Sequence, residues 1–579
     1  MHKKITSIRK VLFIILTGML ASFFVLYGCG KTAPASTADV QEKTGTETET
    51  EDMKEEVDLE LLARGDLRLN ELQLANYGSG SMMLNEEDPD EAVFSLTMPN
   101  LPRSDDANLY LFAKECYEEA GKLAGAPVAE WLKEKESTVS FPYKDRYLFE
   151  QFIPALLIDG KYTPVAKGVY LGNPELLAQN QEDYPEVESK KGLLLDPAML
   201  GKEELTDLGV KHAIYNIPLS AIMGETDDEE YPTIFYEHEG KKYAFNGAAV
   251  SGYDGLFAYL AAEGMCTTVV VLNDWNDDYK EMIHPKARNK ESGAYYYMFN
   301  TKEKVGTKML QAVACFLAER YSGKDHGMIH NWVIANEINQ HKTWNYMDTK
   351  DVEYYTQEFE KGFRTFYQAI KSNYANAKVY FSIDHKWNSN GGNNRVYFNG
   401  KEMVEQFNEI ASQHGSYDWG VALHPYPDPL TRVNYWAQKY DKTSTSKLLT
   451  IMNLSVLTDL MQQKKYLNPE GEVRDITISE LGFSSRFGEK LQAAAFAYGY
   501  YIVEANPYID ALLLNRQTDA KEEMRQGLSF GIYEYDGSEK YLKEIYSCID
   551  TDKAEEYTEM ILNVLGAESM EEALSWAGA

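Results

Sequence analysis

The stretch NWVIANE, residues 331–337, is a run of apolar residues that ends on a carboxylate. The stretch ITISE, residues 476–480, has the same form and also ends on a glutamate. Short, nearly continuous apolar runs are typical of strands covered on both faces, as in a parallel sheet. Each run therefore predicts a buried parallel strand, and its last residue, Glu337 or Glu480, is expected at the carboxyl end of that sheet.

Six further apolar runs flank these two, and amphipathic helical stretches separate them. The runs are GLLLD (192–196), HAIYNIPLS (212–220), TTVVVLND (267–274), KVYFSID (378–384), WGVALHPY (419–426) and IDALLLN (509–515). The clearest helical stretches are 303–321, 352–374 and 447–466. Parallel strands need such crossover helices between them. Eight strand–helix units over roughly 350 residues predict a (β/α)8 TIM barrel rather than an open doubly wound sheet.

The segment before the barrel has a different pattern, with short alternating runs separated by turns. The runs are 92–101, 108–115, 146–165 and 167–173. Asp159-Gly160 lies between two alternating runs and predicts a hairpin. We therefore expect a β-sandwich-like N-terminal module, with a helix near 113–135. A second hairpin is expected over 225–246, inserted after the second barrel strand.

The first residues have the pattern of an export signal. Basic residues at positions 3, 4, 9 and 10 precede an uncharged apolar run over 11–26, which is shorter than the ~20 residues of a spanning helix. Residues 26–29 read LYGC and resemble the lipobox of bacterial lipoproteins. The resemblance implies cleavage before Cys29 and a diacylglycerol on its sulfur. The alternative is an uncleaved N-terminal anchor, and either way the body would lie outside the cytoplasmic membrane.

The predicted organisation is a lipoprotein signal peptide over 1–28, a disordered acidic tether over 29–58, a β-rich accessory module over 59–185, the barrel over 186–550 and C-terminal helices over 551–579. The tether is expected to be disordered because Thr and Glu dominate it and no apolar periodicity is present.

Composition excludes several classes of protein. The chain has 57 basic and 90 acidic residues, a formal net charge of −33, which disfavours binding to nucleic acid or to an anionic membrane surface. A hydrophobic content of 44% excludes a mostly disordered chain. Cys116, Cys266, Cys315 and Cys548 lack Cys-x-x-Cys spacing, which favours inert thiols over a disulfide framework or a zinc site. We expect no metal and no cofactor.

Polar and aromatic residues follow the predicted strands, and in a (β/α)8 barrel these positions form the active-site mouth. They include Asn273 and Trp275 after the third strand, Asn336 and Glu337 at the fourth, Trp387 after the fifth, His424 and Tyr426 at the sixth, Glu480 at the seventh and Asn515 at the eighth. Such groups can hold a polyhydroxylated ligand. For the asparagines the alternative is helix capping, and for the tryptophans it is packing.

The fourth and seventh strands lie across the mouth from each other, so Glu337 and Glu480 can face one bound bond. Glycoside hydrolysis requires two opposed carboxyl groups of this kind, one held protonated and one ionised.

The strand–Asn-Glu, strand–His-x-Tyr and strand–Glu order resembles the retaining glycoside hydrolases of clan GH-A. By that resemblance Glu337 is the general acid/base, Glu480 is the nucleophile and Asn336 contacts the sugar 2-hydroxyl. His424 and Tyr426 would line the neighbouring subsite, with Tyr426 hydrogen-bonded to Glu480. The chain departs from the clan at the end of the eighth strand, where many members have Trp and this sequence has Asn515-Arg516.

The resemblance is closer to a bacterial domain family of unknown function related to that clan, and it covers roughly residues 92–548. The matching segments are LTMPNLPRSDDANLYLF, KYTPVAKGVYLGNPELLA, LGVKHAIYNIPLS, WVIANEIN, WGVALHPYPDPL and ITISELGFSS.

The sequence thus predicts a lipid-anchored, extracytoplasmic, monomeric glycoside hydrolase that acts on an oligo- or polysaccharide by a retaining mechanism. One alternative is a non-catalytic barrel that binds glycans at the cell surface. Another is a solute-binding lipoprotein, which would need two open α/β lobes rather than eight sequential strand–helix units.

Overall fold

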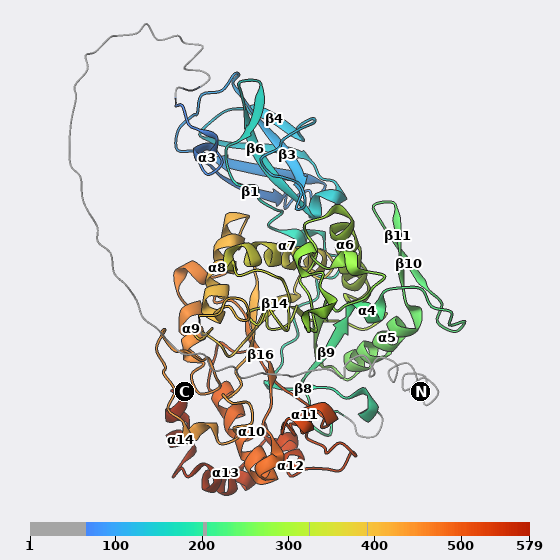
Figure 1. Ribbon diagram of the computed structural model, residues 1–579, viewed down its shortest axis with the longest axis vertical. Coiled ribbons are helices and arrows are strands. Elements are labelled where there is room, and N and C mark those ends of the chain that lie inside the picture. Colours follow the sequence, from blue (N-terminus) through green and yellow to red (C-terminus); the bar gives the residue numbers. More distant parts are fainter. Residues whose placement is uncertain (1–64, 66, 201–204, 324, 391, 579) are drawn as a thin grey trace, which may run out of the picture.

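The computed structural model describes residues 65–578 except 66, 201–204, 324 and 391 (Figure 1). The predicted signal peptide, the tether and Cys29 lie outside the described residues.

Eight parallel strands form a closed barrel, which confirms the predicted fold. In barrel order they are β8 (Lys191–Leu194), β9 (His212–Pro218), β12 (Cys266–Leu272), β13 (Asn331–Ile334), β14 (Lys378–Asp384), β15 (Gly420–His424), β16 (Ile476–Leu481) and β17 (Leu512–Leu514). The barrel closes where β17 pairs with β8, with Leu513 opposite Gly192. Each strand falls within one of the predicted apolar runs or overlaps it.

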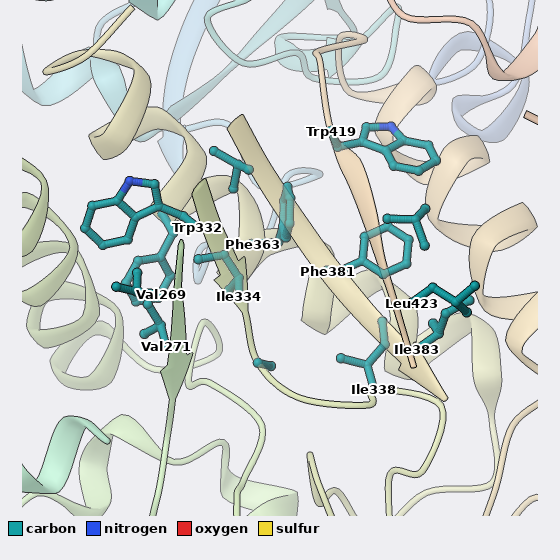
Figure 2. Packing of buried hydrophobic residues seen from close by; sticks show 14 of the residues in the cluster. Val269, Val271, Trp332, Ile334, Ile338, Phe363, Phe381, Ile383, Trp419 and Leu423 are labelled. Carbon is teal, nitrogen blue, oxygen red and sulfur yellow. The ribbon is translucent and has the colours of Figure 1, made fainter. Parts of the chain in front are cut away.

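The core has two layers because successive side chains of a strand point to opposite faces. The outer layer lies between the strands and the surrounding helices. Figure 2 shows part of it, with Val269 and Val271 of β12, Trp332 and Ile334 of β13, Phe381 and Ile383 of β14, and Phe363 from a helix. The inner layer fills the barrel with residues such as Ile214, Val270, Val333, Tyr380, Ala422 and Leu513. The barrel interior is therefore packed, and a ligand is expected to bind at its mouth.

Helices surround the strands. They are α4 (Leu219–Ile222), α5 (Gly247–Ala262), α6 (Lys304–Tyr321), α7 (Val352–Lys371), α8 (Gly400–Gln413), α9 (Ser455–Met461), α10 (Glu489–Glu504), α11 (Lys521–Arg525) and α12 (Leu542–Cys548). The predicted helices over 303–321 and 352–374 correspond to α6 and α7. Asp351 caps α7 by accepting the backbone N–H of Tyr354.

The helix predicted over 447–466 is wrong in its first half, because α9 begins only at Ser455. Residues 447–454 form a buried loop instead. The backbone N–H of Leu449 donates to the carbonyl of His385, and that of Ile451 donates to Pro425. These bonds to the loops after β14 and β15 replace the helical ones, so apolar residues there pack inward without a helix.

Two antiparallel sheets precede the barrel and form the expected sandwich-like module. One contains β1 (Ser79–Leu84), β2 (Glu91–Thr97) and β5 (Glu136–Pro142), after the short helix α3 (Glu71–Leu74). The other contains β4 (Ala129–Leu132), β3 (Asn108–Glu115), β6 (Glu150–Ile158) and β7 (Lys161–Pro164). Asp159 and Gly160, with φ of 50° and 72°, form the predicted turn between β6 and β7.

The helix predicted near 113–135 is wrong. That segment, all of it described by the structure, contains the end of β3, a stretch of turns and β4, which pairs with β3. Gly121, Gly125 and Pro127 interrupt the Ala- and Glu-rich composition that suggested a helix.

The module packs against the side of the barrel formed by α6 and α7 (Figure 1). Glu115 at the end of β3 forms a buried ion pair with Lys308 and accepts from Gln311 at 3.0 Å, both on α6. Gln368 on α7 donates to the carbonyl of Leu171 at 2.7 Å. Polar bonds that are buried between the two parts hold the module in one orientation on the barrel.

Two smaller features complete the chain. The predicted hairpin is present as β10 (Ile234–His238) and β11 (Lys241–Phe245) and projects from the barrel (Figure 1). The C-terminal helices α13 (Thr558–Leu565) and α14 (Met570–Ala577) pack on α10. Among the described residues, no helix combines the length and the apolar character needed to cross a membrane.

Candidate active site

The chain turns sharply after β13 and brings Glu337 to the barrel mouth. Ala335 and Glu337 have φ of 64° and 37°, in the left-handed region that residues other than glycine rarely adopt. The backbone N–H of Glu337 donates to Oγ of Ser382 on β14 at 2.7 Å, which holds this turn. Strained backbone of this kind persists where surrounding contacts enforce it, and it occurs most often at functional sites.

The carboxyl group of Glu337 is buried and favours its protonated form. Glu337 is 5% exposed, and this burial raises its pKa to about 7. The hydrogen bond from His424 opposes this shift, while the charges of Asp384 and Glu480 add to it. Near neutral pH this group can therefore both donate and accept a proton.

Glu480 on β16 has a different environment. The hydroxyl of Tyr426 donates to Oε1 of Glu480 at 2.9 Å, which is the hydrogen bond that the family resemblance implied. The amide of Asn515 lies 3.4 Å from the same oxygen and donates to the Tyr426 hydroxyl at 3.0 Å. The side chain of Glu480 is 25% exposed. It is thus a partly open carboxylate held by neutral donors, as a nucleophile would need to be.

The imidazole of His424 joins the two carboxyl groups. Its Nδ1 lies 3.0 Å from Oε1 of Glu337 and 3.9 Å from Oε2 of Glu480, and its Nε2 lies 2.9 Å from Oγ of Ser479. Oε1 of Glu337 and Oε2 of Glu480 therefore lie no farther apart than the sum of their distances from Nδ1 of His424. Burial lowers the pKa of His424, but the neighbouring carboxylates of Glu480 and Glu337 outweigh it and leave that pKa raised.

A second group of polar side chains lies behind Glu337. Gln340 donates to Oε2 of Glu337 at 3.0 Å and to Asp384 at 2.7 Å, and Asn339 also donates to Asp384. Sequence reasoning did not single out Gln340 or Ser479. The available signal for Gln340 was its position three residues after Glu337, a spacing that brings side chains together in a tight turn.

A family model matches residues 183–573 of the chain. It is described as a family of unknown function, DUF5722. The chain belongs to this family. No curated protein matches it.

Solved structures similar to this DUF5722 chain include glycoside hydrolases. One is a family 39 glycoside hydrolase from Bacteroides cellulosilyticus WH2, with 12% identity and a TM-score of 0.38, covering 84% of this chain and 82% of that one. Another is a β-D-glucuronidase from Dictyoglomus thermophilum, with 11% identity and a TM-score of 0.35, covering 82% and 68%. A third is the GH53 catalytic domain of Ignisphaera aggregans, with 11% identity and a TM-score of 0.37, covering 63% and 98%. At these values, the chemistry of the DUF5722 barrel must be inferred from its own residues.

Two of the predicted substrate contacts in the DUF5722 barrel are almost fully buried. Trp387 is 1% exposed, because the chain after β14 turns inward and the indole packs in the core against Gly400 of α8. Asn273 is 3% exposed, and its amide lies within hydrogen-bonding distance of the carbonyls of Met282, Tyr297 and Met298. The three carbonyls near Asn273 belong to the loop after β12, so this side chain holds that loop.

The other predicted contacts are nearer to the mouth. Asn515 touches Tyr426 and Glu480, as described above. Asn336 is partly buried beside Glu337, and Trp275 is partly exposed, with its indole N–H donating to Asp277 at 2.8 Å. Both remain predicted sugar contacts.

Sequence reasoning also missed Tyr296. This side chain packs on the inner layer of the barrel and stacks beside Trp344, with ring centroids 6.0 Å apart. Burial, together with the charges of Asp274 and Glu480, raises the pKa of Tyr296, so its hydroxyl stays neutral near the candidate nucleophile. Trp344 is itself 5% exposed and stacks against the rings of Tyr295 and Tyr296.

Among the residues that the structure describes, no group of three or more His, Cys, Asp or Glu side chains is arranged to hold a metal ion. The polar groups at the mouth are instead two carboxyl groups, an imidazole, a phenol and amides, which suit acid–base and covalent chemistry.

Proposed function

We propose that this chain is a glycoside hydrolase that cleaves O-glycosidic bonds by a retaining double displacement. One observation carries the proposal: the buried, proton-holding carboxyl of Glu337 and the partly exposed carboxylate of Glu480 both face Nδ1 of His424. A buried carboxyl group that favours its protonated form and a partly exposed carboxyl group, both at one end of a barrel, match the requirement for this reaction.

In the first step Glu480 attacks the anomeric carbon while Glu337 gives its proton to the leaving oxygen. The bond from the anomeric carbon to the leaving oxygen breaks, and a glycosyl ester forms on Glu480. In the second step Glu337, now ionised, takes a proton from water as that water attacks the anomeric carbon. The sugar leaves with its original configuration, Glu480 is released, and Glu337 again holds a proton.

The geometry of His424 is compatible with the retaining mechanism that we propose. Inverting enzymes keep their carboxyl groups about 6.5–9.5 Å apart to admit a water, whereas retaining enzymes have them about 5–5.5 Å apart. The two distances to Nδ1 of His424 place Oε1 of Glu337 and Oε2 of Glu480 close enough together to be compatible with the retaining range.

The raised pKa of Glu337 also fixes the expected pH dependence. The proton donor works only while it is protonated, so kcat/KM for an unactivated glycan should fall as the pH rises through about 7. Tyr426 donates to Glu480 throughout this range, because its own pKa is raised well above the usual value by burial and by the charge of Glu480.

The decisive test is Glu480→Ala, assayed on glycans and aryl glycosides with residues 57–579. We expect turnover to be abolished with the fold intact, and added azide to restore a product of inverted configuration, because azide fills the space of the lost carboxylate. Glu409→Ala on α8 is a matched control, since Asn408-Glu409 is an Asn-Glu pair outside the mouth and Glu409 is exposed. Full activity of Glu480→Ala on a confirmed substrate contradicts the proposal.

We further propose that the protein works outside the cytoplasmic membrane as a lipid-anchored monomer whose substrate is an oligo- or polysaccharide. The LYGC ending of the N-terminal apolar run supports the anchor. A mouth rich in amide, phenol and carboxyl groups supports a polyhydroxylated substrate.

A further inference from the structure

The amide of Gln340 lies between two carboxyl groups. Its Nε2 is 3.0 Å from Oε2 of Glu337 and 2.7 Å from Oδ2 of Asp384. An amide NH₂ group has two hydrogens, so it can donate to both oxygens at the same time. An amide oxygen in this place would face two acceptors and be repelled. The surroundings therefore determine which end of the amide points at the carboxyl groups.

Asp384, the last residue of β14, is a fixed partner in this arrangement. It is 0% exposed, and three N–H groups donate to its carboxylate. They are the amide of Asn339 at 2.5 Å, the backbone N–H of Lys386 at 2.8 Å and the amide of Gln340. Three donors stabilise an ionised carboxylate. The Asp384 carboxylate is thus fixed in place, and the Gln340 amide lies between it and Glu337.

We propose that Gln340 is a positioning residue for Glu337, because its amide links the carboxyl of Glu337 to the fixed carboxylate of Asp384. This link sets the direction in which Glu337 offers its proton. It also sets the pH range in which Glu337 holds that proton. This inference rests on the proposed function of Glu337. The two neighbours act with opposite sign. The hydrogen bond from Gln340 stabilises the ionised form of Glu337, whereas the charge of Asp384 stabilises the protonated form.

Other titratable groups also face Glu337, and the test must leave them unchanged. They are His424 on β15, Glu480 on β16 and the phenol of Tyr397, which lies in the loop after β14. Substitution of Gln340 or Asp384 retains all three. A change in the titration midpoint of Glu337 then reports on the removed group.

The experiment uses the full mature chain with Gln340→Met, which keeps the side-chain length and removes both hydrogen bonds. The midpoint of Glu337 is measured by carbon-13 NMR of glutamate carboxyl groups, assigned by difference from Glu337→Gln. Loss of a donor to a charged group should raise this midpoint by about one pH unit. The basic limb of kcat/KM on an unactivated glycan should move upward by the same amount.

Two further variants sharpen the test. Asp384→Asn removes the fixed charge and should lower the midpoint of Glu337 by a similar amount, opposite in sign to Gln340→Met. Gln357→Met is the matched control, because Gln357 donates to Glu353 at 3.2 Å on the exposed surface of α7. It should leave the midpoint of Glu337 unchanged.

An unchanged or lowered midpoint in Gln340→Met overturns the inference, even when wild-type protein hydrolyses glycans as proposed. Where Asp384→Asn fails to fold, the sign of the Gln340→Met shift decides alone. A wild-type protein that hydrolyses no glycan overturns the proposed function instead, and an upward midpoint shift in Gln340→Met would then still establish Gln340 as the group that sets the protonation of Glu337.

Discussion

Tyr426 holds the carboxylate of Glu480 through one hydrogen bond, and Tyr426→Phe removes that bond while keeping the ring. The ring stacks on Phe530 with centroids 5.8 Å apart, so the side chain should stay in place. A hydrogen bond to a charged group contributes about 1.5–3 kcal/mol. We therefore expect kcat/KM on a confirmed glycan to fall by about 10- to 100-fold.

Tyr435→Phe is the control for that variant. Tyr435 is also fully buried, and its hydroxyl donates at 2.8 Å to the carbonyl of Ala495, away from the mouth. Urea unfolding should show a loss of about 1 kcal/mol of stability for Tyr435→Phe, whose bond is neutral, and of about 1.5–3 kcal/mol for Tyr426→Phe. A loss of activity that is equal in the two variants would show that Tyr426 has no particular role at Glu480.

Sequence reasoning at this scale succeeds for side chains that follow a strand closely. Glu337, Glu480 and Tyr426 lie within three residues of a strand end, or inside the strand, so the strand pattern alone directs them to the mouth. Trp387 and Asn273 also follow strands, but the packing of the next loop decides their burial, and hydrophobic periodicity carries no information about that packing.

Among the elements, β15 begins with Gly420 because neighbouring atoms leave no room for a side chain at this position. A Cβ on Gly420 would lie 2.5 Å from the ring of Tyr380 on β14 and 2.9 Å from the carbonyl oxygen of Asp475. The missing side chain makes room for the Tyr380 ring inside the barrel. Gly420→Ala should therefore destabilise the protein by about 1–3 kcal/mol through overpacking, seen as a lower urea midpoint.

Gly323→Ala is a suitable comparison, because a Cβ at Gly323 would meet nothing within 4 Å. It should leave the urea midpoint nearly unchanged. If Gly420→Ala were as stable as Gly323→Ala, the barrel interior would be less tightly packed than the contacts around Tyr380 indicate.

The sequence predicts the barrel strands correctly but predicts two helical segments wrongly, and the difference lies in the residues and contacts that end each element. The barrel strands are short apolar runs between polar residues, and this pattern has few other interpretations. The run over 447–466 has helical periodicity throughout, yet Leu449 and Ile451 bond to neighbouring loops. The segment 113–135 has helix-forming composition, but its glycines and proline favour turns. In both segments tertiary contacts or turn residues outweigh local propensity.

At the scale of the whole molecule, the proposed lipid anchor rests on Cys29. Cys29→Ser should abolish incorporation of a labelled fatty acid, because serine offers no thiol for the diacylglycerol, and the uncleaved precursor should accumulate. Both effects are measured by metabolic labelling and gel mobility. Cys548→Ser, at a buried free cysteine of α12, should keep the label. Labelling that persists in Cys29→Ser would contradict a lipid anchor at this residue.

The contact between the module and the barrel has a consequence for how such a chain can evolve. Gln311, Gln368 and Lys308 belong to barrel helices, but their buried partners Glu115 and Leu171 belong to the module. A recombination event that joined the barrel to a different N-terminal domain would leave these polar groups without partners, at about 1–3 kcal/mol for each. We therefore expect the module and the barrel to be inherited as one unit, with substitutions on the two sides of this contact changing together.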